Sequence, residues 1–141
     1  MIMNKTETVL KEKTILFVFN RISNDFPKIK KLLNERGFAV GLRRTCEKVL
    51  VMQDLEKIFK KTFNHNDRKI TQFILNSPTK VILLEKENAI NELKDFVGPN
   101  DRTKAPIGTL TKLFGEYGVA CPCDKEHAEK LLDLCNHKIS I

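Results

Sequence analysis

Hydrophobic and polar residues follow two patterns along this chain. Short continuous apolar runs predict buried β-strands, and they lie at residues 14–19, 38–42, 79–85 and 118–121. Apolar residues that recur three and four positions apart predict amphipathic helices within residues 23–37, 52–63, 70–74, 89–96 and 124–135. Residues 97–110 hold two prolines and two glycines and show neither pattern, so we expect a long ordered loop there.

The order of these elements predicts the fold class. It reads β-α-β-α-α-β-α-loop-β-α, and without the extra helices it becomes βαββαβ. This is the ferredoxin-like arrangement of an α+β protein, a four-stranded antiparallel sheet with helices packed on it. We expect residues 14–141 to form one domain and the polar residues 1–13 to form a flexible N-terminal arm.

Composition and charge narrow the functional classes. The chain of 141 residues has no stretch that approaches the length of a membrane span, and its charged start does not resemble a signal peptide. Four cysteines without a secretory signal favour a reducing, cytoplasmic compartment. A net charge of +7 favours acidic partners without choosing among nucleic acid, anionic lipid and protein.

Cysteine and histidine residues gather near the C-terminus and suggest a zinc site. They are Cys121, Cys123, His127, Cys135 and His137. Their spacing, C-x-C-x3-H-x7-C-x-H, matches no common structural zinc pattern, and Cys135 is at a core-facing position of a predicted helix. The single residue between Cys121 and Cys123 is proline, which also disfavours a redox pair. We therefore predict neither a metal nor another cofactor.

Three segments resemble the nucleoside diphosphate kinase family, and the resemblance extends over about residues 13–137. NSPTKVILLEKENAI (76–90) is similar to the family's third strand and the turn that follows it. GPNDRTKAPIGTLTKLFG (98–115) is similar to the family stretch G-x-T-[DN]-P-x-x-A-x-P-G-T-[LI]-R-x-x-F-G. The segment around GVACPCD (118–124) falls where the family has N-x-[VI]-H-G-S-D-S, which carries its phosphorylated histidine.

The resemblance also implies that the family's catalytic residues are replaced. Cys121 takes the position of the histidine, Phe19 that of a lysine, and Thr111 that of an arginine that follows GT[LI]. The family's threonine near the start of the long loop corresponds to Asn100, and one of its arginines to Lys94. The aspartate that caps the last helix remains as Asp124. These six positions would outline a vestigial pocket with no catalytic residue.

We therefore expect a catalytically inactive nucleoside diphosphate kinase-like domain that acts as a structural or protein-interaction module. Degenerate domains of this family occur in ciliary and flagellar axonemes, so the resemblance implies a cytoskeletal location and partners such as tubulin or axonemal proteins. Lys28, Lys30 and Lys31 are the candidate contacts. One alternative is a nucleotide-binding sensor without phosphotransfer. Another is an RNA-binding module, but the chain lacks the aromatic strand run of such modules, so nucleic acid is a less favoured partner.

Overall fold

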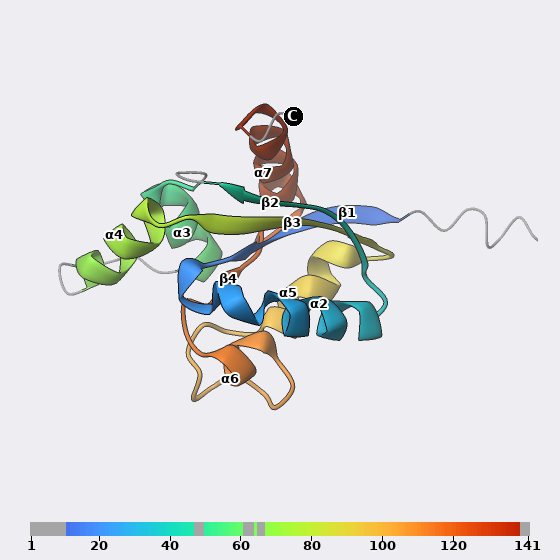
Figure 1. The fold of residues 1–141 in the computed structure, drawn as a ribbon, viewed down its shortest axis with the longest axis horizontal. Coiled ribbons are helices and arrows are strands. Elements are labelled where there is room, and N and C mark those ends of the chain that lie inside the picture. The colour runs from blue at the N-terminus through green and yellow to red at the C-terminus, as the bar shows by residue number, and fades with distance from the viewer. Residues whose placement is uncertain (1–10, 47–49, 61–63, 65–66, 139–141) are drawn as a thin grey trace, which may run out of the picture.

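The computed structural model describes residues 11–46, 50–60, 64 and 67–138, and its strands form one sheet with helices packed around it (Figure 1). The strands are β1 (Glu12–Val18), β2 (Ala39–Cys46), β3 (Thr79–Lys86) and β4 (Val119–Ala120). The helices are η1 (Asn20–Asp25), α2 (Phe26–Glu35), α3 (Met52–Phe59), α4 (Arg68–Asn76), α5 (Ala89–Val97), α6 (Leu110–Phe114) and α7 (Lys125–Lys138).

The four strands form one antiparallel sheet in the order β2-β3-β1-β4. The central pair is β1 and β3, which run side by side from Glu12 opposite Lys86 to Val18 opposite Lys80. The short strand β4 adds to the free edge of β1, where Phe17 lies opposite Ala120. The predicted ferredoxin-like α+β fold with four antiparallel strands is confirmed.

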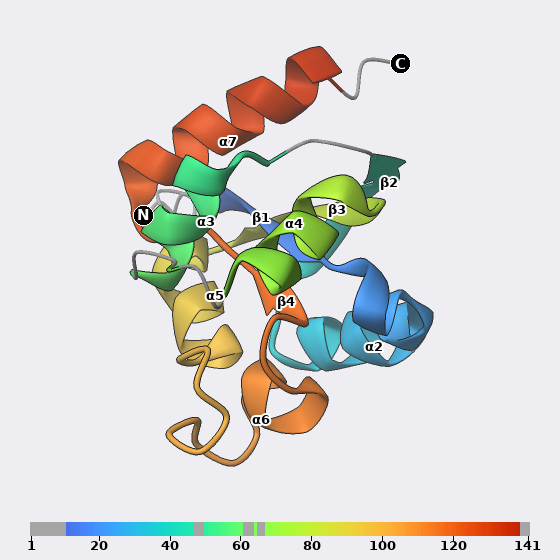
Figure 2. The same ribbon diagram turned by 90° about the vertical axis from the view of Figure 1, so that its left-hand side faces the viewer.

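Helices cover both faces of the sheet, which explains why its central strands are apolar throughout. Leu16 and Val18 of β1 pack with residues of α2 and α5 on one face. Ile15 and Phe17 point to the opposite face and pack with residues of α3, α4 and α7. Figure 2 shows the sheet edge-on between α7 and α3 on one side and α2 and α5 on the other. A strand buried on both faces reads as a continuous apolar run.

The boundaries of some elements differ from the prediction. The second strand continues past residue 42 to Cys46, with a bulge between Val40 and Arg43. The apolar run stops earlier because most of the last residues of the strand are polar, but these residues still pair with β3. The first strand begins at Glu12 and so includes the end of the predicted arm. The helix predicted over 52–63 ends at Phe59, and residues 61–63, like residues 1–10 of the arm, lie outside the described part of the chain.

A short helix, α6, begins at the last residue of the predicted loop 97–110, and the sequence pattern does not reveal it. Thr109 precedes it in an extended conformation, and its hydroxyl oxygen accepts a hydrogen bond from the Lys112 amide at 3.2 Å. This is the usual N-cap arrangement. Five residues are too few to establish a helical period, so the sequence pattern predicts no helix there. Within the described residues, no helix has the length and apolarity that crossing a bilayer requires.

Candidate functional site

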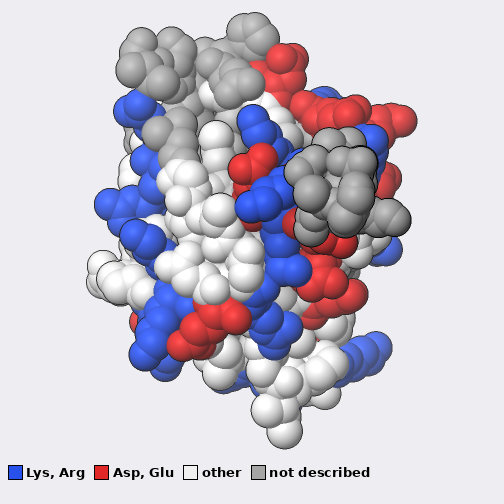
Figure 3. Space-filling view, turned by 90° about the vertical axis from the view of Figure 1, so that its right-hand side faces the viewer, with Lys and Arg blue, Asp and Glu red and all other residues white. Residues whose placement is uncertain are grey.

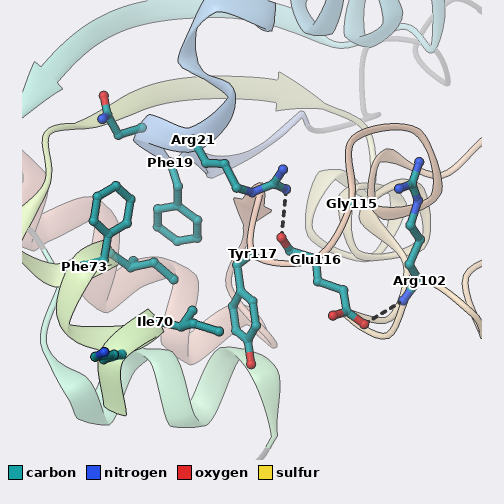
Figure 4. A pocket seen from close by; sticks show the side chains of 11 residues that line it. Phe19, Arg21, Ile70, Phe73, Arg102, Gly115, Glu116 and Tyr117 are labelled. Carbon is teal, nitrogen blue, oxygen red and sulfur yellow. Dashed lines mark hydrogen bonds between the residues drawn. The ribbon is translucent and has the colours of Figure 1, made fainter. Parts of the chain in front are cut away.

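The first of two cavities near the predicted pocket has aromatic walls. It has a volume of about 680 Å³ and is lined by η1, α4 and the turn between α6 and β4. Phe19, Ile70, Phe73 and Tyr117 supply its apolar surface, as Figure 4 shows. We call it the aromatic cavity. Phe19 is almost fully buried, whereas Phe73 is 55% exposed. Where the family resemblance places a phosphate-binding lysine, this cavity therefore has an aromatic ring.

Two arginines line the aromatic cavity, but hydrogen bonds direct them at the neighbouring loop. One terminal nitrogen of Arg21 donates to the carbonyl oxygens of Phe114 and Glu116, both at 2.8 Å. Arg102 donates through its Nε to the Lys112 carbonyl oxygen at 3.0 Å, and its backbone amide donates to Glu116 Oε2 at 3.2 Å (Figure 4). Both residues therefore hold α6 and the turn that follows it in place.

The second cavity contains three of the six predicted pocket positions. It has a volume of about 620 Å³ and lies between the ends of α3 and α5 and the segment before α7. Because Lys60 and Lys94 line it, we call it the lysine cavity. Asn100 and Cys121 are the other two predicted positions there. The amide oxygen of Asn100 accepts a hydrogen bond from the backbone amide of Tyr117 at 2.9 Å, so it serves the loop.

Tyr117 connects the walls of the two cavities, and the sequence analysis did not identify it. Its ring lines the aromatic cavity and meets the ring of Phe59, which lines the lysine cavity, edge to face at 5.3 Å. Its φ of 58° is unusual for a tyrosine. Four of the six predicted positions are thus divided between the two cavities, because Phe19 lines one of them and Lys94, Asn100 and Cys121 line the other.

Cys121 occupies the position that the resemblance gives to the phosphorylated histidine, and its environment is apolar. It is 7% exposed and packs in the same cluster as Val119 and Val97. Burial raises the pKa of this thiol to about 12, although the nearby Lys94 ammonium opposes the shift. A thiol with so high a pKa carries almost no thiolate at neutral pH, and the thiolate is the nucleophilic form.

The remaining two predicted positions have structural environments. Thr111 is buried within α6, 3% exposed. Asp124 precedes α7, and its Oδ1 accepts a hydrogen bond from the backbone amide of His127 at 2.8 Å. This bond is the main reason why the pKa of Asp124 is lowered. The predicted capping role of Asp124 is confirmed.

The structure brings together one group of titratable side chains that sequence reasoning did not connect. Cys123, half-buried at the lysine cavity, lies 3.6 Å from His127 Nδ1, and His127 Nε2 lies 3.7 Å from Asp54 Oδ1. The four-residue spacing of Cys123 and His127 could have suggested their contact, but nothing local points to Asp54 on α3. In the described part of the chain, no three His, Cys, Asp or Glu side chains gather in a way that could hold a metal ion.

The sheet order, the helices on both faces and the long loop define a known fold. The structure of the Aquifex aeolicus nucleoside diphosphate kinase superposes with a TM-score of 0.69, covering 89% of this chain and 94% of that one at 16% identity. The Halobacterium salinarum nucleoside diphosphate kinase in complex with CDP gives a TM-score of 0.70 over 89% of this chain and 87% of that one, also at 16% identity. The chain thus has the nucleoside diphosphate kinase fold.

Sequence comparison points in the same direction. The chain is 30% identical over 93 residues to the nucleoside diphosphate kinase of Geobacter sulfurreducens, covering 65% of this chain and 66% of that protein. It is 29% identical over 84 residues to a probable nucleoside diphosphate kinase 5 of Arabidopsis thaliana, covering 57% of this chain and 55% of that one. The chain therefore spans about half to just under two thirds of these relatives. No protein-family model matches it. It is a nucleoside diphosphate kinase-like domain in fold and in sequence similarity.

Proposed function

We propose that this chain is a nucleoside diphosphate kinase-like domain that does not transfer phosphate and acts as a protein-interaction module. Its setting would be a microtubule-based assembly such as the ciliary or flagellar axoneme, with tubulin or axonemal proteins as partners. The inactivity rests on the residues of the two cavities. The setting and the partners rest on the family resemblance together with the charge of the surface.

The burial of Cys121 is the observation that carries the proposed inactivity. Phosphoryl transfer through a covalent intermediate needs an activated nucleophile that the substrate can reach. Cys121 is 7% exposed, and burial raises the pKa of its thiol to about 12. It is therefore an inert core side chain at neutral pH.

Most of the six predicted pocket positions also lack the positive charge that phosphoryl transfer requires. Phe19 and Thr111 stand where the resemblance places a lysine and an arginine, and both are buried. Stabilising the charge that develops on the transferred phosphoryl group is the main task of such a site. Lys94 at the lysine cavity is the one cation retained among the six predicted positions.

The outer surface offers features suited to protein contacts. Ile70 and Phe73 of α4 are 46% and 55% exposed at the aromatic cavity, with Lys69 beside them. On α2, the side chains of Lys30 and Lys31 are exposed. Figure 3 shows lysine and arginine side chains along both sides of an uncharged strip, with most acidic side chains on the right of the view and a smaller group at the lower end of the strip. A surface with such separated charge favours an oriented protein partner.

The two alternative functions have less support. A nucleotide sensor would use Lys94 and the lysine cavity, where Lys60 is a second cation. An RNA-binding module of the βαββαβ type reads single strands on an open face of its sheet. Here both faces of the sheet are packed with helices. Nucleotide binding is therefore the alternative that an experiment should address first.

Incubation with labelled Mg-ATP is expected to leave the protein unphosphorylated and to transfer no label to a diphosphate acceptor. The Cys121→His variant should also remain inactive, because the two cations that the resemblance places at Phe19 and Thr111 would still be missing. The measurements are phosphate bound to protein, by filter binding, and labelled triphosphate product, by chromatography. Stoichiometric phosphoprotein in the unaltered chain would contradict the proposal.

Reversing the charge of Lys30 and Lys31 to glutamate is expected to weaken co-sedimentation with microtubules about tenfold at low salt, because cationic side chains attract an acidic partner surface. The matched control reverses Lys125 and Lys130, which are exposed on α7 at the opposite face of the sheet. Adding Lys28→Glu tests the third predicted contact. Its Nζ lies 5.9 Å above the Phe114 ring, so this third change should also lower the melting temperature slightly. If the two double variants weaken co-sedimentation equally, or if neither weakens it, this contact surface is refuted.

A further inference from the structure

A half-buried thiol, a buried imidazole and a buried carboxylate stand in line where α7 meets α3. Cys123 Sγ lies 3.6 Å from Nδ1 of His127, and Nε2 of the same ring lies 3.7 Å from Oδ1 of Asp54. His127 is 1% exposed and Asp54 is 4% exposed. A nucleophile, a base and an orienting carboxylate in this order are the parts of a base-assisted nucleophilic site. Contacts of this length are usual for such sites without substrate.

Hydrogen bonds determine which ring nitrogen of His127 can act as the base. The backbone amide of Cys123 donates to Nδ1 at 3.4 Å, so Nδ1 is the unprotonated nitrogen, and the Cys123 thiol shares its lone pair from 3.6 Å. The proton of the neutral ring is then on Nε2, which faces Asp54. Nε2 has no hydrogen-bond partner among the described residues, and Asp54 Oδ1 lies just beyond hydrogen-bonding distance from it. A small movement of Asp54 Oδ1 toward Nε2 would form the ion pair when the imidazole becomes protonated.

Hydrogen bonds at the starts of α3 and α7 hold these groups in place. Asp54 is in the first turn of α3, and its Oδ2 accepts from the Val51 amide at 3.1 Å, which leaves Oδ1 for the imidazole. The His127 amide donates to Asp124 Oδ1 at the start of α7. The thiol of Cys123 has a second acceptor in Asp124 Oδ2, also at 3.6 Å. The start of α7 and the first turn of α3 thus determine the position of the imidazole between them.

The lysine cavity next to Cys123 has walls suited to an acyl group. Besides its two lysines, it is lined by apolar side chains, among them Ile58, Phe59, Val97 and Pro122. Its volume of about 620 Å³ is large enough for a small organic ligand. Cys121 also lines it, but burial keeps that thiol protonated, so Cys123 is the better nucleophile of the two.

We propose that Cys123, His127 and Asp54 form an S-acylation site that accepts apolar acyl groups from thioesters. Cys123 Sγ forms a bond to the carbonyl carbon while its proton passes to His127 Nδ1. The bond between that carbon and the donor sulfur then breaks, and the leaving thiolate takes the proton from the imidazolium. The products are S-acyl Cys123 and a free thiol, so no oxidant or further reactant is needed. This reaction is separate from phosphoryl transfer and does not depend on the proposed function.

The charged groups around His127 favour a neutral base at rest. Burial is the main reason why the pKa of His127 is lowered, and the Lys57 ammonium on α3 adds to this, while Asp54 and Asp124 oppose it. Burial also raises the pKa of the Cys123 thiol, with Asp124 as the next cause. A neutral imidazole next to a neutral thiol is the starting state that the reaction requires, since the base must remove the proton.

The test uses S-phenyl thiobutyrate with the full chain and measures acylation of each cysteine by peptide mass spectrometry. Cys46 is the internal comparison, because it is also a partly buried thiol but has Arg44 as its charged neighbour. Cys123 is expected to react at least about 100-fold faster than Cys46, the usual effect of a positioned base. Its rate should change little from about pH 7 to 8.5, where His127 is neutral, while the rate at Cys46 rises with thiolate.

Two variants separate base assistance from structure. His127→Gln should lower the ratio of the Cys123 rate to the Cys46 rate by about 100-fold, and Asp54→Asn by a smaller factor of about 10. Partial unfolding would instead raise both rates and bring their ratio close to 1. The rate at Cys123 would then also rise with pH. Equal rates at the two cysteines of the unaltered chain would overturn the proposal, as would an unchanged ratio in folded His127→Gln.

Discussion

Mg-ADP is expected to bind this protein at least 100-fold more weakly than it would bind a domain that retains the family's lysine and arginine. The resemblance places these two cations at Phe19 and Thr111, and both side chains are buried here. A hydrogen bond to a charged group contributes about 1.5–3 kcal/mol, so two losses amount to about 3–6 kcal/mol, or roughly 10²–10⁴ in Kd.

Isothermal titration calorimetry with Mg-ADP and Mg-ATP gives the measurement. We expect no saturable heat in the micromolar range. If binding is found there, the Lys94→Ala variant decides its location, because Lys94 is the retained cation at the lysine cavity. Micromolar affinity that Lys94→Ala removes would favour the nucleotide sensor over the interaction module. Micromolar affinity that this variant leaves unchanged would point to the aromatic cavity instead.

Replacing Gly98 with alanine is expected to lower the free energy of unfolding by about 2–4 kcal/mol, the sum of backbone strain and a steric clash. Gly98 has φ 76° and ψ 180°, a conformation that is open essentially to glycine alone. An added Cβ would lie 3.0 Å from both Cβ and Cγ2 of Thr109, which is the N-cap residue of α6. The substitution therefore disturbs both ends of the long loop at once.

The matched control is Gly41→Ala in β2, where φ is not positive and a Cβ would approach the Leu83 carbonyl oxygen at 3.4 Å. Chemical denaturation monitored by circular dichroism measures both variants, and Gly41→Ala should cost less than about 1 kcal/mol. A result for Gly98→Ala within that range would mean that the loop can rearrange. A large effect would show that Gly98 and its contact with Thr109 determine the fold of the loop.

Local patterns were enough to predict most of the fold from the sequence. The apolar runs of β1 and β3 allow only buried strands, and Pro27 and Gly37 mark the start and the end of α2 as expected. Strand ends and α6 were missed, since pairing across the sheet and capping by Thr109 decide them. The strand ends depend on partners that are distant in the sequence, and α6 has too few residues to show a helical period.

From the sequence alone, the family resemblance implied that Cys121 takes the position of a histidine, and the local order of residues placed Asp124 at the start of the last helix. The tertiary structure alone decided the chemistry of the cysteines. Packing buries Cys121 in the apolar cluster and raises its pKa, while Cys123 stays half-buried beside His127. It also brought Asp54 of α3 to the start of α7 and placed Phe59 against Tyr117. Such contacts join residues more than fifty positions apart, and only the packing of helices on the sheet determines which of them meet.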